Sequence, residues 1–389
     1  MSIFEQDKSF IANTYARFPL HLVEGKGCIA KDENGKEYID LGSGIGVTAF
    51  GYCDDIWQKA VTEQLSKVQH TSNLYYTTPC VELAKTLCER TGMKKVFFSN
   101  SGAEANECAI KVARKYASEK KGSDYYTIVS LVNSFHGRTL TTLSATGQDV
   151  FHKLFNPLTP GFISTPANDC EAFVKCINEN KVAGVIIETV QGEGGVNPLD
   201  EQFVKTVAKV CNDNDIVLIV DEVQTGNGRC GHLYSFMEYG IAPDVVSTAK
   251  GLGGGLPIGA TLMGEKVQSV LSYSDHGSTY GGNPIACAGA KSVVDRLTDE
   301  FLTEVNKKGA YVREKLSNCK GVISITGKGL MLGIKTERGA KEVVLDCLKE
   351  GVICLTAKDK VRLLPPLNIS YELLDKALEV IKNACAKGE

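Results

Sequence analysis

The chain has 389 residues, with 43 Lys and Arg against 46 Asp and Glu and a formal net charge of −3. This length allows two domains, and the near-balance of charge gives no electrostatic reason to expect nucleic acid or an anionic membrane as a partner. The start MSIFEQDKSF lacks the regions of a signal peptide, and no apolar run approaches the roughly 20 residues of a membrane span. We therefore expect a cytoplasmic protein without membrane contact.

The cysteines and histidines form no metal-binding pattern. No two of the 14 cysteines are spaced C-x-x-C, and the six histidines never fall three to five residues apart. Scattered cysteines in a chain without an export signal are expected to stay reduced. We expect neither a metal site nor a disulfide framework.

The first predicted elements in chain order are a hairpin and a helix. The dipeptide Asn34-Gly35 separates residues 27–31 from residues 36–41, and Asn-Gly between such segments is a strong hairpin signal. A helix is predicted from about residue 55 to residue 68, because its apolar residues recur at helical spacing.

From about residue 94 to residue 264 the predicted strands and helices alternate. The strand candidates are residues 95–99, 126–131, 182–188, 216–222, 245–249 and 260–263. Several are continuous apolar runs, as parallel strands buried on both faces require. The alternation predicts an open α/β sheet with helices on both faces, which binds ligands at the carboxyl ends of its strands.

After about residue 284 the pattern becomes that of a smaller α+β unit. A long helix is predicted from residue 285 to about residue 316. It is followed by strands at 322–326, 330–335, 352–355 and 361–364 and helices at about 340–350 and 371–387. We predict a large domain over residues 51–285 and a small domain over residues 286–389, which the N-terminal segment 1–50 joins.

Two neighbouring predicted strands end in an acid and an amine. Asp221 ends the run IVLIVD, and Lys250 ends the run DVVSTAK before a cluster of glycines. Pyridoxal phosphate needs such a pair, a lysine for its Schiff base and an acid to keep its ring nitrogen protonated. Gln224 lies near enough in sequence to donate to the phenolic oxygen of the ring. Alternatively, Asp221 only caps a turn and Lys250 is a surface lysine.

The segment NSGAEAN, residues 100–106, follows the strand at 95–99 and opens a helix. Free N–H groups at a helix start, without bulky side chains, bind phosphate. An ordinary capping box of Ser101 and Glu104 is the alternative. Phe135 follows another strand, where it could stack on a planar ring, and Arg138 offers a fork for a carboxylate.

Two further features remain open or are rejected from the residues alone. Glu193 and Arg362 are far apart in sequence, so the sequence alone cannot show whether they form a pair. The glycines of residues 226–231 fit G-x-G-x-x-G, but residues 221–225 stand between the apolar run and the first glycine, so the glycines do not form the strand-to-helix turn of a dinucleotide site.

Together the motifs resemble class III pyridoxal-phosphate aminotransferases of fold type I. The similarity runs over nearly the whole chain, in order, and no single motif carries it. The fold it implies is a large, mostly parallel seven-stranded sheet domain with helices on both faces, plus a small α+β domain from the N- and C-terminal segments. The motifs are NSGAEA at 100–105, FHGRT at 135–139, DEVQ at 221–224, TAKG at 248–251 and STYGGNP at 278–284.

The resemblance implies roles for individual residues at the cofactor. Lys250 would form the Schiff base, Asp221 would pair with the pyridine nitrogen, and His136 and Gln224 would also contact the cofactor. Phe135 and Val223 would sandwich the ring. The phosphate would be bound by Ser101, Gly102 and Ala103 of one subunit and by Thr279 of the other, which implies a homodimer with shared active sites.

The resemblance also implies a substrate class. Segments near Tyr15, His70, Glu193 and Arg362 are similar to the branch that transfers the terminal amine of acetylornithine to 2-oxoglutarate. Arg138 would clamp the carboxylate distal to the reacting amine, with Tyr15 and Ser278 lining the pocket. Arg362 would take the α-carboxylate of glutamate, and Glu193 would neutralise Arg362 when the acylated ornithine is bound.

Alternatives to this substrate remain. They include ornithine, 4-aminobutyrate, succinylornithine or succinyl-diaminopimelate as amino donor, an aminomutase, and a non-catalytic binding protein of the same fold. The sequence departs from the family at Thr326, where an arginine is common.

Overall fold

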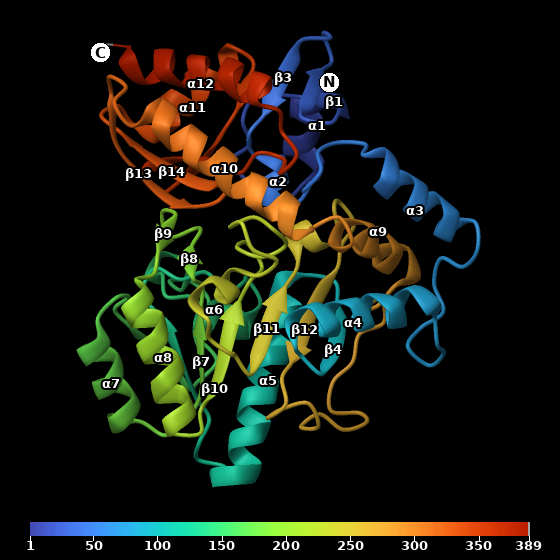
Figure 1. Cartoon of the computed structure of the whole chain (residues 1–389), viewed down its shortest axis with the longest axis vertical. Helices are drawn as coiled ribbons and strands as arrows, with labels where there is room; N and C mark the ends of the chain where they lie inside the picture. The colour runs from blue at the N-terminus through green and yellow to red at the C-terminus, as the bar shows by residue number, and fades with distance from the viewer. Residues whose placement is uncertain (388–389) are drawn as a thin grey trace.

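The computed structural model describes residues 1–387 and is organised around a seven-stranded sheet (Figure 1). The order of the strands is β4-β12-β11-β10-β7-β5-β6. They are β4 (Lys95–Ser99), β5 (Thr127–Leu131), β6 (Phe162–Thr165), β7 (Val182–Ile187), β10 (Val217–Asp221), β11 (Val245–Thr248) and β12 (Gly259–Met263). Only β12 runs against its neighbours, β11 and β4, so the predicted mostly parallel sheet is confirmed.

Among the strands of this large sheet, the one that the sequence pattern missed is β6, at its edge. It has four residues, of which only Thr165 is buried. An edge strand has a neighbour on one side only, and a short, half-exposed segment lacks the continuous apolar run that marks the central strands.

Helices cover both faces of the sheet. Along β10, Val217 and Ile219 pack into the core that contains α5 (Gly102–Lys121), whereas Leu218 and Val220 pack on the opposite face with α8 (Glu201–Asp213). Alternate side chains of a strand point to opposite faces, so a strand buried on both sides is apolar throughout. The helices α7 (Cys170–Glu179) and α4 (Thr78–Thr91) lie beside α8 and β4, respectively (Figure 1).

Segments from the two ends of the chain lie together above the carboxyl ends of this sheet (Figure 1). β3 (Glu37–Asp40) pairs in parallel with β15 (Val352–Ile353), which joins the sheet of β1 (Leu22–Lys26) and β2 (Ile29–Asp32) to the C-terminal segment. A second sheet has the order β13-β14-β17-β16. The division of the chain near residues 50 and 285 stays a prediction.

The remaining elements connect or cover these sheets. Strands β13 (Val322–Lys328), β14 (Met331–Thr336), β16 (Leu355–Ala357) and β17 (Lys360–Leu363) form the C-terminal sheet. The other helices are α1 (Ile3–Phe10), α2 (Ser43–Gly46), α3 (Asp55–Leu65), α6 (Leu140–Ala145), α9 (Pro284–Val294), α10 (Asp299–Leu316), α11 (Ala340–Lys349) and α12 (Tyr371–Ala386). No helix among the residues described here is long and apolar enough to cross a membrane.

The long helix predicted from residue 285 to residue 316 is wrong, because the chain forms two helices there. The first, α9, ends at Val294, and Thr298 begins the second by accepting a hydrogen bond from the N–H of Phe301. Thr298 followed by two acids is an N-cap signal inside a continuous apolar pattern. The helical spacing of apolar residues continues across the break between α9 and α10, so this spacing alone did not predict it.

The strand predicted at residues 352–355 also divides in two. β15 pairs with β3, whereas β16 pairs antiparallel with β17, in the other sheet. A switch between two sheets leaves no mark in the apolar pattern, because each half has one buried residue and is otherwise half-buried.

Candidate active site

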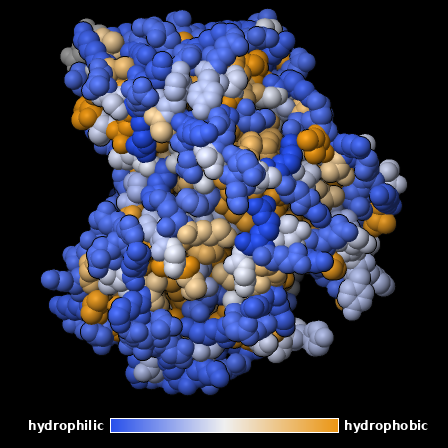
Figure 2. All heavy atoms as spheres, viewed as in Figure 1, coloured by the Kyte–Doolittle hydropathy of each residue, from blue (hydrophilic) through white to orange (hydrophobic). Residues whose placement is uncertain are grey.

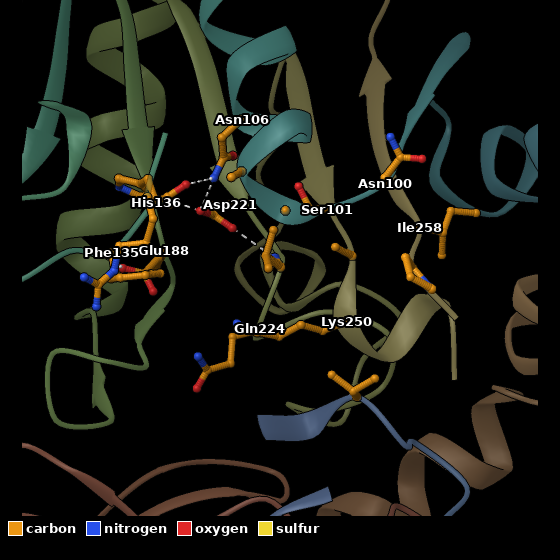
Figure 3. A pocket seen from close by; sticks show the side chains of 18 of the residues that line it. Asn100, Ser101, Asn106, Phe135, His136, Glu188, Asp221, Gln224, Lys250 and Ile258 are labelled. Atoms are coloured by element: carbon orange, nitrogen blue, oxygen red, sulfur yellow. Dashed lines mark hydrogen bonds and ion pairs between the residues drawn. The ribbon is translucent and has the colours of Figure 1, made fainter. Parts of the chain in front are cut away.

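A cavity of about 470 Å³ opens at the carboxyl ends of β10 and β11, where the large sheet meets the terminal segments (Figure 3). Figure 3 shows Asp221 and Lys250 facing each other across it, with Phe135 and Glu188 to one side and Ser101 to the other. The predicted residues that line it are Ser101, Gly102, Ala103, Phe135, His136, Arg138, Asp221, Val223, Gln224 and Lys250.

The Asp221 carboxylate is buried and accepts three hydrogen bonds from protein donors. Its Oδ2 accepts from Asn106 Nδ2 and His136 Nδ1, both at 2.8 Å, and its Oδ1 accepts from the N–H of Val223 at 3.0 Å. An ionised carboxylate only accepts, so the His136 proton is on Nδ1. His136 Nε2 is buried without a partner in the described part of the chain.

Asn106 on α5 positions this carboxylate from behind. Its Nδ2 also donates to the carbonyl of His136 at 2.8 Å, and its Oδ1 accepts from Ser247 Oγ at 2.5 Å. The side chain thus links α5, the His136 loop and β11 to Asp221. Sequence reasoning did not single out Asn106, although it lies in the segment that opens α5.

Lys250 follows β11 in a strained backbone conformation. Its φ is +44°, a left-handed value that is uncommon outside glycine and costs on the order of 1–3 kcal/mol. Burial lowers the pKa of the Lys250 ammonium, and the charges of Glu193 and Asp221 oppose this shift. The side chain is therefore closer to a neutral, nucleophilic amine than a surface lysine is.

The start of α5 presents its first N–H groups to the cavity. Ser101 is the N-cap and accepts from the N–H of Glu104 at 3.2 Å. The Glu104 carboxylate accepts a hydrogen bond from the N–H of Asn100. In a full capping box it would accept from the N–H of the N-cap, Ser101. A Cβ on Gly102 would lie 2.6 Å from Val223, so only glycine fits there and the helix start stays free of side chains.

Arg362 and Glu193 lie together, although they are 169 residues apart in sequence. Arg362 on β17 is 3% exposed, and its Nη1 donates to Glu193 Oε1 at 2.6 Å and to Gln224 Oε1 at 3.1 Å. Gln224 Nε2 in turn donates to Glu193 Oε1 at 3.3 Å. Although burial opposes ionisation, the Arg362 guanidinium lowers the pKa of Glu193, which makes the pair ionic. The Gln224 amide is engaged with this pair.

Besides Glu193 and Arg362, which lie beside the cavity, three further predicted residues do not line it. Ser278 Oγ accepts from Asn100 Nδ2 at 3.2 Å, at the edge of the site. Thr279 lies in a separate cavity of about 160 Å³ with His70, and Tyr15 is 75% exposed near the N-terminus. A single copy of residues 1–387 thus does not bring these side chains to Lys250.

The glycine-rich segment at residues 226–231 joins the large sheet to the C-terminal segment. Arg229 within it is buried and donates to the carbonyls of Leu330 and Pro365, at 3.1 and 2.6 Å. The segment is a series of turns and opens no α-helix. The segment therefore connects two parts of the structure, and it does not form the strand-to-helix turn of a dinucleotide site.

Glu188, just beyond β7, is a buried acid of the site that sequence reasoning did not single out. It lines the cavity, and its Oε2 accepts from the N–H of Phe135 at 2.9 Å. Burial raises the pKa of Glu188 to about 7; the nearby His136 opposes this shift and Asp221 adds to it. The signal was present, because Glu188 ends an apolar run just as Asp221 does.

Replacing Glu188 by glutamine should remove a pH dependence of stability. A raised pKa in the folded state contributes stability that is complete below the unfolded value near 4.5 and is lost as the pH rises through about 7. Between pH 5 and pH 8 the free energy of unfolding of the wild type should therefore fall relative to that of the variant, by up to about 3 kcal/mol. Urea unfolding at both pH values, with saturating cofactor, measures this. Glu89→Gln on α4 is the control. If wild type and Glu188→Gln differed in free energy of unfolding by the same amount at both pH values, the raised pKa of Glu188 would be refuted.

Comparisons with known proteins identify the family. Residues 10–385 match the model of the class III aminotransferases, and the chain belongs to this family. It is a pyridoxal-phosphate-dependent aminotransferase of fold type I, as the sequence motifs indicated.

Individual relatives are similar over their whole length. The acetylornithine aminotransferase of Haemophilus ducreyi is 50% identical over 381 residues, which cover 97% of both chains. That of Aquifex aeolicus is 46% identical, over 96% of this chain and 99% of its own.

Solved structures agree in fold. The ornithine aminotransferase from Toxoplasma gondii, described with partial occupancy of PLP at its active site, has a TM-score of 0.93 at 30% identity, covering 98% of this chain and 93% of its own. The N-acetylornithine aminotransferase from Stenotrophomonas maltophilia has a TM-score of 0.84 at 32% identity, covering 99% and 98%.

Proposed function

We propose that this protein is an N2-acetylornithine:2-oxoglutarate aminotransferase of arginine biosynthesis. It transfers the terminal amine of acetylornithine to the enzyme and then to 2-oxoglutarate, in two half-reactions of a ping-pong cycle. The observation that carries the proposal is the ion pair of Arg362 with Glu193 beside the cavity. The names of full-length relatives support the choice of acetylornithine.

The cavity fits pyridoxal phosphate on features of the chain itself. A buried carboxylate at Asp221 and an amine at Lys250 face each other, and the start of α5 is kept open by Gly102. We assign Ser101, Gly102 and Ala103 to the phosphate, because N–H groups at a helix start bind anions. We assign Phe135 and Val223 to the two faces of the ring.

The cofactor, when bound, supplies an electron-accepting ring that stabilises the negative charge left when a proton leaves the amine-bearing carbon. Asp221 keeps the ring nitrogen protonated. Lys250 holds the cofactor covalently and moves the proton at the reacting carbon, for which its lowered pKa suits it. His136 and Asn106 hold the Asp221 carboxylate in place by their hydrogen bonds.

The Glu193–Arg362 pair solves a two-substrate problem. Acetylornithine reacts through its terminal amine, and Arg138 binds its distal carboxylate while Glu193 masks Arg362. Glutamate reacts through its α-amine, and its α-carboxylate displaces Glu193 from Arg362. Gln224 donates to Glu193 and accepts from Arg362, so it touches both members of the pair. We assign Tyr15 and Ser278 to the rim of this pocket.

We further propose a homodimer with shared active sites, in which Thr279 reaches the phosphate bound by the partner. Aromatic side chains that line the same cavity as Thr279 are strongly exposed in the single chain, with Tyr75 at 72% and Tyr76 at 99%. On the face shown in Figure 2, apolar side chains gather across the middle of the molecule. Sedimentation that found only monomers would remove this part of the proposal.

The proposed location is the cytoplasm. All 14 cysteines are free thiols, and Cys53 among them is exposed. A reducing compartment preserves such thiols.

A half-reaction panel tests the substrate assignment. The purified holoenzyme is mixed with acetylornithine, ornithine, succinyl-diaminopimelate or 4-aminobutyrate, and loss of the cofactor's absorbance is followed. Acetylornithine should give the highest kcat/KM, because acylation leaves its α-nitrogen uncharged, so this nitrogen needs no anionic partner in the cavity. A higher value for another donor would assign that substrate instead, and no reaction with any donor would favour an aminomutase or a binding protein.

A further inference from the structure

Arg138 is held at the cavity by aromatic rings and not by an acid. Its Cζ lies over the Phe151 ring, 4.0 Å from the ring centroid, and 5.4 Å from that of Phe135. In residues 1–387 no carboxylate forms an ion pair with Arg138. Glu107 on α5 is instead bonded by the neighbouring Thr139, at 2.5 Å. The guanidinium N–H groups are thus left for a ligand.

The Phe151 ring stands on a turn that several hydrogen bonds hold. Phe151 ends a short 3-10 turn (Asp149–Phe151), and its N–H donates to the carbonyl of Gln148 at 3.1 Å. Gln148 Nε2 donates to the carbonyl of Ser134 at 3.0 Å, and the His152 ring bonds the carbonyl of Leu143 at 2.9 Å. The turn is therefore tied both to α6 and to the loop that carries Phe135.

The two rings form a corner around the guanidinium. The centroids of Phe135 and Phe151 are 6.0 Å apart, and the ring planes meet at 81°. A cation over a ring face is attracted by the ring's negative π surface. Contact with a ring face leaves the in-plane N–H edge of a guanidinium free for the two oxygens of a carboxylate.

We propose that Phe151 is the positioning residue for Arg138, and that it thereby sets the preference for donors with a carboxylate distal to the reacting amine. The inference rests on the proposed function for the role of Arg138. A free arginine side chain samples many rotamers, and binding a carboxylate must restrict them. Because Phe151 already restricts Arg138, its loss should weaken binding of that carboxylate and leave the chemical step unchanged.

The test compares Phe151→Leu, which removes the π face and keeps an apolar side chain, with Phe151→Tyr, which keeps the ring. The donors are acetylornithine and N-acetylputrescine, which is the same amine without the carboxylate. Phe151→Leu should raise the KM for acetylornithine about tenfold at unchanged kcat. The reaction of N-acetylputrescine should change less than twofold, and Phe151→Tyr should retain the wild-type preference.

An equal loss with both donors, or no loss with either, would overturn the inference and leave Phe151 as a packing residue. An equal KM increase in Phe151→Tyr would also overturn it. The melting temperature and cofactor absorbance of each variant show whether the fold and cofactor site are intact. If the wild type prefers another carboxylated donor, the proposed function fails, but the comparison is repeated with that donor and its decarboxylated form.

Discussion

Replacing Lys250 by alanine should lower kcat in both half-reactions by roughly 10⁴-fold or more, the upper range for loss of a general acid–base group. Lys250 is the only lysine that lines the cavity in the described part of the chain, and it faces Asp221 there. In the proposed mechanism, its removal takes away both the covalent attachment of the cofactor and the base that moves the proton at the reacting carbon.

Two measurements accompany the kinetics of Lys250→Ala. Borohydride reduction followed by mass spectrometry should fix the cofactor to the wild-type chain and not to the variant. The control is Lys307→Ala on the exposed side of α10, which should keep full activity. Retention of more than about one hundredth of the wild-type kcat would contradict the assigned role, since general acid–base catalysis contributes about 10²-fold or more.

Replacing Asp221 by asparagine should lower kcat by roughly 10²- to 10³-fold, the range seen when one preorganised electrostatic contact is removed. An amide of the same shape cannot keep the ring nitrogen protonated. It also meets donors from three sides, since His136, Asn106 and Val223 all donate to the carboxylate. We therefore expect a loss of stability of about 1–3 kcal/mol as well.

A matched aspartate separates these two effects. Asp244 enters β11, accepts from the N–H of Leu218 at 2.9 Å and pairs with Lys266 at 3.0 Å, away from the cavity. Asp244→Asn should lower the melting temperature and spare kcat, whereas Asp221→Asn should lower both. If the two variants lost kcat equally, the effect of Asp221 would be one of stability alone.

The central pair of the site was predictable from the sequence because of how parallel strands end. Asp221 and Lys250 each close a buried apolar run, and the carboxyl ends of neighbouring parallel strands lie at one edge of a sheet. Glu188 has the same signal, at the end of β7. The end of a buried apolar run therefore locates a residue at the carboxyl edge of the sheet, but it does not show which of the acids there contacts the cofactor.

The substrate side was not predictable from local pattern. Glu193 lies in the loop between β8 (Val190–Gln191) and β9 (Asn197–Pro198), and Arg362 lies on β17, in a different sheet. Their pairing arises where the terminal segments close over the large sheet, and no spacing in the sequence records it. The contact of Phe151 with Arg138 has the same origin, because a single 3-10 turn carries no periodic signal.

The most direct test of the account is the substrate preference of Glu193→Ala, measured as kcat/KM for glutamate divided by that for acetylornithine. Without Glu193, Arg362 keeps Gln224 as a neutral acceptor and carries an unmasked charge. Glutamate then binds to Arg362 without displacing a competing carboxylate. Acetylornithine, in contrast, can place its carboxylate on the exposed Arg362 charge and so bind in an unproductive orientation. We predict that the ratio rises at least about tenfold, with Glu201→Ala on α8 as an unaffected control. An unchanged ratio in Glu193→Ala would contradict the switch.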